Sequence, residues 1–376
     1  MRILHLYKDY YPPVVGGVER TLSRLARGAV RAGHDVTVLC SAHGARQDRD
    51  EVVDGVRVIR CAEWARVAST PICPGMPSRL AGLRADVVHL QFPSPPGEVS
   101  YLLAGRGIPM VISYHCDITR QAAVLPLYRP VIDALLARAA VVMTSSPQLA
   151  ANSPFLQRYR QKCKVVTHGI DLEPFDGLGR LDGEAVVLRA RYGGGPLVLF
   201  VGRFRHYKGL PVLLRAMPRV EGTLVLVGGG AEERALRRLH AELRLGDRVH
   251  FAGSLDEHGL LAHYRAADVF VLPSVRTTEA FGLVLIEALA SRLPVVTTEL
   301  GTGTSFINQQ GETGLVVPPG DPDALAQALN SLLGDPALRR RLGEAGQRRA
   351  HAMFSTQKMV AGTLAVYDEV VGRTGH

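Results

Sequence analysis

Two glutamates, Glu279 and Glu287, bracket an apolar stretch of seven residues. The run predicts a helix over 283–290, which leaves Glu279 in the preceding loop and Glu287 about one turn into the helix. A carboxylate among apolar neighbours needs hydrogen-bond donors, and the hydroxyls of a ribose can supply two. The pattern therefore indicates a nucleotide-binding carboxylate, against the simpler alternative of a solvent-facing glutamate pair.

The predicted start of this helix carries small residues. Ala280 and Gly282 allow backbone N–H groups, together with those of Phe281 and Leu283, to approach a ligand. Because a helix N-terminus favours anions, we expect these groups to meet phosphate or sugar oxygens.

Two cations lie five positions apart in a loop that follows a predicted strand. Arg203 and Lys208 both fall in the segment 202–209, which ends at a predicted helix. A leaving diphosphate is stabilised by cations that reach it. Both side chains can therefore serve one anion, although surface charge near a turn is the alternative.

Two glycine-rich loops also connect a strand to a helix. Gly228 opens a run of three glycines, and Gly16 and Gly17 precede the first predicted helix. Glycine lets backbone approach phosphate closely. Such turns are common in Rossmann-like folds, so each loop alone is also consistent with a plain connection.

One histidine is placed where a ligand would lie. His115 follows the predicted strand 110–114, and Asp117 comes two residues later. Ligands of parallel sheets bind outside the carboxyl ends of strands. A structural histidine is the competing interpretation.

Two Asp-x-Asp pairs resemble metal-binding patterns but have structural explanations. Asp48 and Asp50 sit in a charged loop, whereas Asp321 suits a helix N-cap before Pro322 and Asp323. With Arg203 available to neutralise phosphate, we expect neither a metal nor a cofactor.

Short β-rich runs alternate with helical stretches along the whole chain, which predicts parallel sheets covered by helices on both faces. Two such series indicate an α/β protein with two doubly wound, Rossmann-like domains facing a cleft. We expect a linker at 171–180, domains at 1–172 and 173–354, and a last helix at 355–376 that returns to the first domain.

Charge is distributed unevenly. Residues 1–170 contain 21 Lys and Arg against 12 Asp and Glu, whereas residues 171–376 are balanced, so the first half carries the whole net charge of +9. A basic half suits an anionic membrane or a phosphate-bearing acceptor, or is simply a solvated surface. Nucleic acid is not expected, because no basic run carries interleaved aromatics.

The composition favours a cytoplasmic protein. No apolar run approaches the roughly 20 residues of a membrane span, and the start does not resemble a signal peptide. The five cysteines form no C-x-x-C pair, which favours reduced, buried thiols. The basic first half also suggests that the protein could be attached to the inner face of the cell membrane.

These motifs together resemble the retaining glycosyltransferases of family 4, which have the two-domain GT-B fold. The resemblance covers essentially the whole chain and rests on Gly16-Gly17, Arg203, Lys208 and the Glu279-x7-Glu287 block. Two further stretches, 114–118 and 301–305, look like bacterial polysaccharide mannosyl- and rhamnosyltransferases of this family.

The resemblance implies a role for each candidate residue. Arg203 and Lys208 would hold the diphosphate, Glu287 the ribose, and Glu279 with the backbone of 280–283 the donor sugar and phosphates. Gly16 and Gly17 would touch the phosphate, Gly228 would line the donor site, and His115 would contact the sugar near the reacting carbon.

The expected reaction is transfer of a mannose-like hexose from a nucleotide-diphosphate sugar, with GDP favoured over UDP. The acceptor would be a glycan or a lipid-linked glycan in cell-surface polysaccharide or glycolipid synthesis. Retention of configuration and independence of metal follow from the resemblance alone.

Three other classes compete with this reading. A dehydrogenase is disfavoured because the G-x-G-x-x-G fingerprint is missing after the first strand. A sugar-nucleotide epimerase or phosphorylase shares the two-domain plan and stays open. A non-catalytic donor-binding subunit is disfavoured by the intact Lys208, Glu279 and His115.

Overall fold

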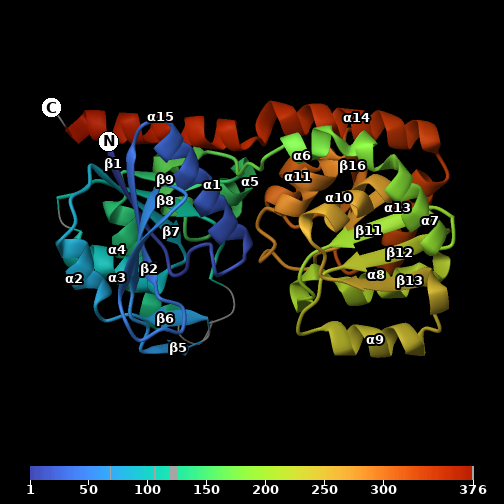
Figure 1. Cartoon of the computed structure of the whole chain (residues 1–376), viewed down its shortest axis with the longest axis horizontal. Helices are drawn as coiled ribbons and strands as arrows, with labels where there is room; N and C mark the ends of the chain where they lie inside the picture. The colour runs from blue at the N-terminus through green and yellow to red at the C-terminus, as the bar shows by residue number, and fades with distance from the viewer. Residues whose placement is uncertain (68, 106, 119–124, 375–376) are drawn as a thin grey trace. The chain divides into compact units, whose positions relative to one another are not determined.

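The computed structural model describes residues 1–67, 69–105, 107–118 and 125–374. The chain divides into two compact units, Met1–Gly169 with Thr356–His376, and Ile170–Ser355 (Figure 1).

The sheet of the first unit runs in the order β10-β9-β8-β7-β1-β2-β4-β3 within the described residues. All neighbouring strands are parallel except β3 and β4, which are antiparallel. The strands are β1 (Arg2–Leu6), β2 (Asp35–Ser41), β3 (Arg49–Val53), β4 (Val56–Cys61), β7 (Val87–Phe92), β8 (Met110–Tyr114), β9 (Val141–Thr144) and β10 (Cys163–Val165); β5 (Ala65–Val67) and β6 (Thr70–Ile72) form a separate hairpin.

Alternate residues of these strands enter two different cores, because successive side chains point to opposite faces of a sheet. Leu4 and Leu6 join the core beside α2 (Met76–Ala81), α3 (Pro95–Ala104), α4 (Leu125–Arg138) and α5 (Pro147–Asn152). Ile3 joins the opposite core, beside α1 (Gly17–Arg31) and α15 (Thr356–Thr374).

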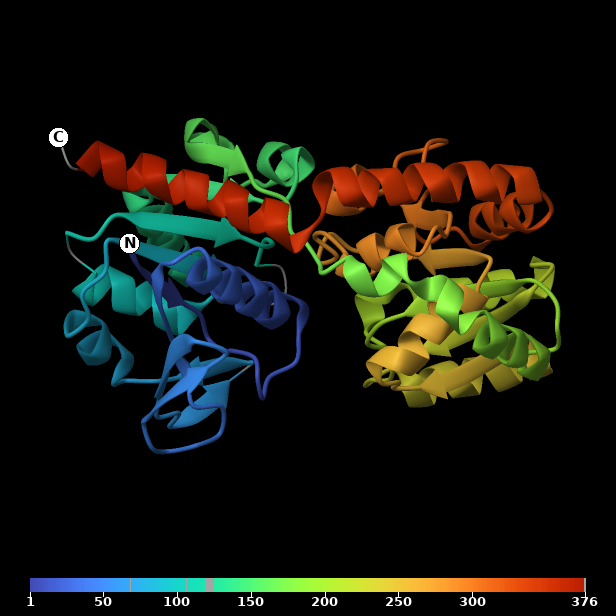
Figure 2. The same ribbon diagram turned by 45° about the horizontal axis from the view of Figure 1, so that its top comes forward.

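The C-terminal helix α15 packs on the first unit, beside α1 (Figure 2). Tyr367 is fully buried there, and its hydroxyl lies 2.5 Å from Nδ1 of His89 on β7. The expected return of the last helix to the first domain is therefore confirmed.

The sheet of the second unit is all parallel and runs in the order β13-β12-β11-β14-β15-β16. This is the order of a doubly wound nucleotide-binding sheet. The strands are β11 (Leu197–Val201), β12 (Thr223–Val227), β13 (Val249–Gly253), β14 (Val269–Leu272), β15 (Val295–Thr298) and β16 (Gly314–Val317).

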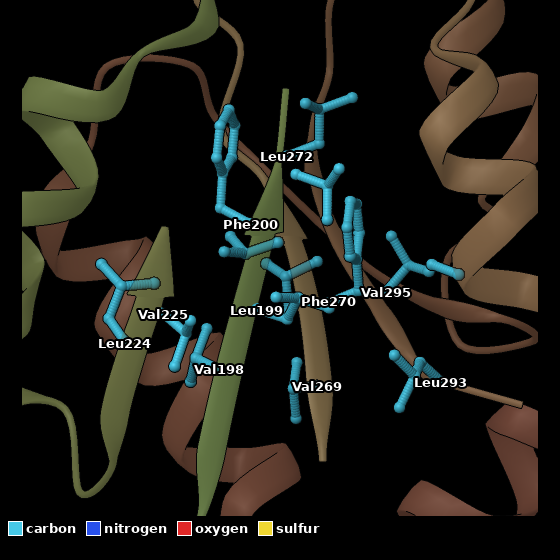
Figure 3. Packing of buried hydrophobic residues seen from close by; sticks show 14 of the residues in the cluster. Val198, Leu199, Phe200, Leu224, Val225, Val269, Phe270, Leu272, Leu293 and Val295 are labelled. Atoms are coloured by element: carbon cyan, nitrogen blue, oxygen red, sulfur yellow. The ribbon is translucent and has the colours of Figure 1, made fainter. Parts of the chain in front are cut away.

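The helices of the second unit cover both faces of its sheet. Buried Leu199, Phe200, Phe270 and Val295 fill the centre of the core (Figure 3). The helices are α6 (Glu173–Asp176), α7 (Asp182–Arg191), α8 (Leu210–Ala216), α9 (Glu233–Glu242), α10 (Glu257–Ala266), α11 (Leu283–Ala290), α12 (Gly303–Ile307), α13 (Pro322–Leu333) and α14 (Pro336–Met353).

The predicted linker is wrong. Residues 171–180 contain α6, and Leu172 and Leu178 are buried in the second unit. Pro174 lies in the first turn of α6 and Gly177 follows its end, so the residues that suggested a linker form short helical turns here. The predicted fold class, an α/β protein with two Rossmann-like domains, is confirmed.

Among the helices of the described residues, none combines the length and the apolar character that crossing a membrane requires.

Candidate active site

The strand order of the second unit fixes where its chemistry gathers. From β11 the chain continues to β12 on one side of the sheet, whereas β14 lies on the other side of β11. The strand order therefore reverses between β11 and β14. Ligands of such sheets bind outside the carboxyl ends of the strands at this point. The loops 202–209 and 273–282 emerge there, and Val275 N–H donates to the Tyr207 carbonyl at 2.8 Å, which ties them together.

The two loops meet in a buried ion pair. Lys208 Nζ lies 2.5 Å from Glu279 Oε2, and the residues are only 7% and 6% exposed. Both were singled out in the sequence, but their direct contact was not anticipated. Because an ammonium group has three donors, Lys208 keeps capacity for an anion beside Glu279.

The carboxylate of Glu279 is fixed from several sides. Ser274 Oγ donates to Glu279 Oε2 at 2.9 Å, and Thr302 Oγ1 donates to the Glu279 carbonyl at 2.8 Å. Thr298 Oγ1 in turn donates to the Ser274 carbonyl. Such contacts hold the loop and orient the carboxylate before any ligand arrives.

Lys208 stays charged despite its burial. Burial by itself lowers the pKa of Lys208. The electrostatic effects of Glu279 and Tyr207 and the hydrogen bond to Glu279 together outweigh burial, so the pKa of Lys208 lies above its usual value. A permanent cation at the switch point of the sheet suits a phosphate ligand.

Two glycines let the loops come this close. Gly209 has φ of +70°, and a Cβ there would lie 1.9 Å from the Pro273 carbonyl oxygen. Gly228 has φ of +122°, and a Cβ there would lie 2.1 Å from the Gly202 carbonyl oxygen. The backbone of the glycine run that begins at Gly228 thus packs against the loop 202–209. Any side chain at Gly228 would push that loop away.

The start of α11 is formed by the residues Ala280–Leu283 that the sequence analysis singled out. Gly282 is its N-cap, with φ of +89° and no side-chain cap. The carbonyl of Ala280 accepts from Gly303 N–H at 2.8 Å. Phe281 is buried and meets Phe354 edge-on, so its ring anchors the loop, while Leu283 is half-buried at the first turn.

Glu287 is held from inside the unit. Its Oε2 accepts a hydrogen bond of 2.8 Å from the hydroxyl of Tyr264, a fully buried residue of α10. Burial, with the charge of Glu287, holds the pKa of Tyr264 well above its usual range, so the phenol remains a donor. Tyr264 gave no signal in the sequence, because nothing local marks a tyrosine in an amphipathic helix as a partner.

Arg203 differs from Lys208 in exposure. It lies in the same loop but is open to solvent, whereas Lys208 is buried. An exposed guanidinium interacts more weakly with a charged partner, because solvent screens it.

In the first unit, Gly16 is the N-cap of α1, and Gly17 begins the helix. Gly16 is extended and has no side-chain cap, and a Cβ there would lie 2.1 Å from Glu19 Oε2. Glycine at this position therefore leaves room for the Glu19 carboxylate over the helix start. These residues follow β1, whose carboxyl end borders the switch point between β1 and β7.

His115 follows β8 and is held on both ring nitrogens. Its Nε2 lies 2.9 Å from Gln91 Oε1, and its Nδ1 lies 3.3 Å from Nε2 of His168, whose ring is stacked on it. With the Gln91 oxygen accepting, His115 carries its proton on Nε2. Burial, with the nearby His168, holds the pKa of His115 well below its usual range, so the ring is neutral.

More polar residues lie on the same side of these strands. His5 and His89 are fully buried, with ring centroids 5.1 Å apart, and His89 Nε2 lies 2.8 Å from Ser113 Oγ. Burial lowers the pKa of His5 to about 3. The edge of the first unit is thus backed by neutral polar groups.

The Asp-x-Asp pairs have structural partners. Asp48 accepts from Ala62 N–H and Arg79, and Asp50 pairs with Arg57. Asp321 caps α13 by accepting from two backbone N–H groups, as its sequence context predicted. Within the described residues, no group of three or more His, Cys, Asp and Glu is arranged to hold a metal.

The structure therefore gathers the candidates into a set within each unit. Lys208 and Glu279 touch, and the Gly228 run and the start of α11 border their loops; Gly16, Gly17 and His115 lie at strand ends of the first sheet. Sequence reasoning missed the supporting residues. They are Gln91, His168, Tyr264, Ser274 and Thr302.

Comparison with known proteins identifies the class. Residues 15–174 match the model of Glycosyltransferase Family 4, and residues 189–349 match the model of Glycosyl transferases group 1. The chain belongs to the family 4 glycosyltransferases, as the motifs had indicated.

Individual relatives narrow the resemblance. The chain is 33% identical to O-antigen chain mannosyltransferase C of Escherichia coli over 369 residues, 98% of each protein. It is 35% identical to the D-rhamnosyltransferase WbpZ of Pseudomonas aeruginosa over 360 residues, 94% of this chain and 92% of that protein.

Solved structures show the same fold. Sucrose-phosphate synthase from Thermosynechococcus elongatus aligns over 99% of both chains, with a TM-score of 0.83 and 28% identity. Anabaena HepE in complex with UDP aligns over 98% of this chain and 100% of that one, with a TM-score of 0.77 and 20% identity. These neighbours are GT-B glycosyltransferases, so the GT-B fold is confirmed.

Proposed function

We propose that this glycosyltransferase moves a mannose-like hexose from a GDP-sugar to a glycan or lipid-linked acceptor, with retention of configuration and without a metal. The observation that carries the proposal is the buried Lys208–Glu279 pair at the switch point of the second sheet. Two relatives support the choice of sugar, because one is named as a mannosyltransferase and the other as a D-rhamnosyltransferase. D-Rhamnose is 6-deoxymannose, so both share the manno configuration.

The residues of the second unit divide the donor between them. Lys208 and Arg203 neutralise the diphosphate, and the backbone N–H groups of 280–283 add donors at the start of α11. Glu287 accepts from ribose hydroxyls while Tyr264 holds it in place. Glu279 keeps Lys208 oriented and reaches the donor sugar.

The first unit contributes neutral groups. Gly16 and Gly17 offer backbone N–H groups at the start of α1 to phosphate oxygens. His115 contacts the sugar near the reacting carbon. Because its ring is neutral, it acts by hydrogen bonding and not as a charged acid.

We infer a front-face reaction. The acceptor hydroxyl forms the new C–O bond on the face from which the nucleoside diphosphate leaves, and a phosphate oxygen of the leaving group takes the hydroxyl proton. Asp117, the carboxylate nearest to His115 in sequence, is not a free nucleophile, because Oδ1 accepts from Tyr114 and from Ser153, each at 2.6 Å. Trapping of a covalent sugar–enzyme adduct would overturn this route.

The acceptor proposal rests on the relatives and on charge. The relatives include the O-antigen mannosyltransferase and a phosphatidyl-myo-inositol mannosyltransferase of Mycobacterium leprae, 29% identical over 375 residues. The basic first half, with all of the net +9 charge, suits an acceptor displayed at an anionic membrane surface. If co-sedimentation with vesicles does not depend on anionic lipid, the proposal that the acceptor is met at an anionic membrane surface is contradicted.

A donor panel tests the proposal directly. Thermal shifts are measured with GDP-mannose, UDP-glucose, ADP-glucose and dTDP-rhamnose, each in excess EDTA and in Mg²⁺. We expect stabilisation by the GDP-sugar in both buffers, since a ligand that binds only the folded state raises its stability. Stabilisation by UDP-glucose alone would move the assignment to a UDP-sugar donor.

Two controls separate binding from catalysis. Lys208→Ala should lose the GDP-mannose shift, whereas Arg234→Ala, an exposed change on α9, should keep it. Donor incubated without acceptor should stay unchanged on the time scale of transfer; its conversion to another nucleotide sugar would indicate an epimerase. The anomeric configuration of the product, read by NMR, tests retention.

A further inference from the structure

A second cavity opens in the second unit, away from the donor loops. Its volume is about 550 Å³, within the range of small-molecule sites. Asp268, directly before β14, and Pro294, directly before β15, both line it. Because all strands of this sheet are parallel, the cavity lies at the edge where they begin, opposite the edge that carries Lys208 and Glu279.

The cavity is rich in arginine. Arg265, Arg292, Arg339 and Arg340 line it, against Asp176 and Asp268. Both carboxylates are engaged: Asp268 pairs with Arg189 at 3.0 Å and accepts from Leu197 N–H, and Asp176 pairs with His351 at 2.9 Å. Arg265 pairs with Asp182 and Arg339 lies 3.7 Å from Asp268, so the excess positive charge of the lining rests on Arg292 and Arg340.

Two of the arginines are available for a ligand. Arg292 is exposed, and its Nε donates to the neutral Gln347 Oε1 at 2.7 Å. Arg340 is exposed and forms no ion pair within the described residues. Guanidinium groups bind phosphate monoesters through charge-assisted and often bidentate hydrogen bonds.

The rest of the lining is less polar. Phe175, Leu178 and Leu293 supply apolar surface beside the arginines. This combination, with a volume well above that of a bare ion, suits a phosphate carried on a sugar ring. The ring would lie on the apolar surface and the phosphate would meet Arg292 and Arg340.

The cavity is connected to the donor site by one side chain. Tyr264 lines the cavity, meets Phe175 edge-on at 5.9 Å, and donates through its hydroxyl to Glu287 Oε2. Its ring is fully buried between the two edges of the unit. A ligand that packs on Phe175 therefore also restrains Tyr264, whose ring meets Phe175 and whose hydroxyl donates to Glu287.

We propose that this cavity binds a phosphorylated sugar and that its occupation tightens donor binding at Glu287 through Tyr264. The binding claim stands on the cavity alone, whereas the coupling claim rests on the proposed function. By linkage, the donor must tighten the phosphorylated sugar by the same factor.

Calorimetry tests the binding claim. Mannose 6-phosphate and inorganic phosphate are titrated separately into the full-length protein, the Arg292→Ala/Arg340→Ala variant, and a matched Arg234→Ala/Arg238→Ala variant that removes two exposed arginines of α9. We expect mannose 6-phosphate to bind the wild type and the matched control equally, and the cavity variant at least about tenfold more weakly. Equal binding of mannose 6-phosphate by all three proteins, or no binding at millimolar concentration, overturns the proposal. If inorganic phosphate binds more tightly than mannose 6-phosphate, the ligand is the free ion, and the claim that the cavity recognises a sugar is overturned.

One variant separates this cavity from the donor site. Lys208→Ala should bind mannose 6-phosphate as the wild type does, because Lys208 lies at the other edge of the sheet. If Lys208→Ala abolishes binding in a protein that still melts cooperatively, the ligand occupies the donor site and the cavity proposal fails.

Donor titrations test the coupling. With saturating mannose 6-phosphate, the donor Kd of the wild type should fall about fivefold, at the lower end of usual coupling. Tyr264→Phe should still bind mannose 6-phosphate, but adding mannose 6-phosphate to this variant should leave its donor Kd unchanged. An unchanged wild-type Kd, or full coupling in Tyr264→Phe, overturns the coupling; failure of every donor to bind would instead count against the proposed function and leave the calorimetric result standing.

Discussion

The side chains at the carboxyl ends of the parallel strands differ in charge between the two units. At the carboxyl edge of the second sheet, a buried cation and a buried carboxylate are in contact, Lys208 with Glu279. At the same edge of the first sheet, His115 is neutral and is held by Gln91 and His168. The second unit presents fixed charge, and the first presents neutral donors and acceptors.

The difference fits the ligands proposed for the two edges. A diphosphate is best matched by a cation that burial keeps oriented, and the cost of burying Lys208 is offset by Glu279. A sugar ring and an acceptor hydroxyl carry no charge, so neutral hydrogen-bonding groups suit them. The comparison predicts that variants in the second unit change donor affinity and stability together, whereas His115 variants change turnover.

The strongest test of the charged edge is Lys208→Ala. It removes a phosphate contact and leaves the buried Glu279 carboxylate unpaired, so kcat/KM should fall about 10³-fold and the free energy of unfolding should fall by about 3 kcal/mol. Steady-state kinetics and urea unfolding measure the two effects. Adding Glu279→Gln should restore part of the stability but not the activity; wild-type turnover in Lys208→Ala would end the comparison.

The neutral edge is tested by His115→Ala. Loss of a hydrogen bond to the reacting sugar should lower kcat about 10²-fold while the donor KM changes little. His168→Ala, which removes a positioning residue, should have a smaller effect on kcat. A large rise in donor KM with unchanged kcat would place His115 in ground-state binding.

Glu287→Ala should act mainly on donor binding. A lost hydrogen bond to a charged group is worth about 2 kcal/mol, which corresponds to about a 30-fold higher donor KM, with kcat nearly constant. Tyr264→Phe serves as the control and should give a weaker version of the same change. If kcat falls as much as KM rises, the assignment of Glu287 to the nucleotide is wrong.

The histidines of the first unit make its stability depend on pH. Burial lowers the pKa of His5 to about 3, so the unfolded chain, with a pKa near 6.5, binds a proton that the folded protein does not. The contribution is complete above pH 6.5 and is lost as the pH falls from there toward 3; at pH 5.5 the loss from His5 is about 1.4 kcal/mol. Urea unfolding at pH 7.5 and 5.5 should show a smaller decline in His5→Leu than in the wild type, and equal declines would refute the assignment.

Arg203→Ala should give the smallest effect. Because Arg203 is exposed, removing it should raise the donor KM only about fivefold, and the difference from the wild type should shrink as salt is added. The effect of Lys208→Ala should persist in salt, since buried pairs are screened less. A salt-independent loss in Arg203→Ala would indicate that the side chain is buried by the donor.

Much of the second unit was accessible to local reasoning. The helix 283–290 has the predicted bounds, because an apolar run and a glycine turn mark it directly. The first unit was less accessible. Strand β3 and the β5–β6 hairpin were missed, since their residues are largely exposed and lack an apolar period.

The sequence by itself determined the class of fold and the family, and it singled out Lys208, Glu279 and Glu287 as candidates, because spacing and local pattern carry that information. Only the tertiary structure decided that Lys208 and Glu279 form one ion pair and that Tyr264 holds Glu287. It also decided that His168 stacks on His115 and that the segment 171–180 packs as helix. These contacts join residues far apart in the chain, and they depend on which strands become neighbours and on which face each helix covers.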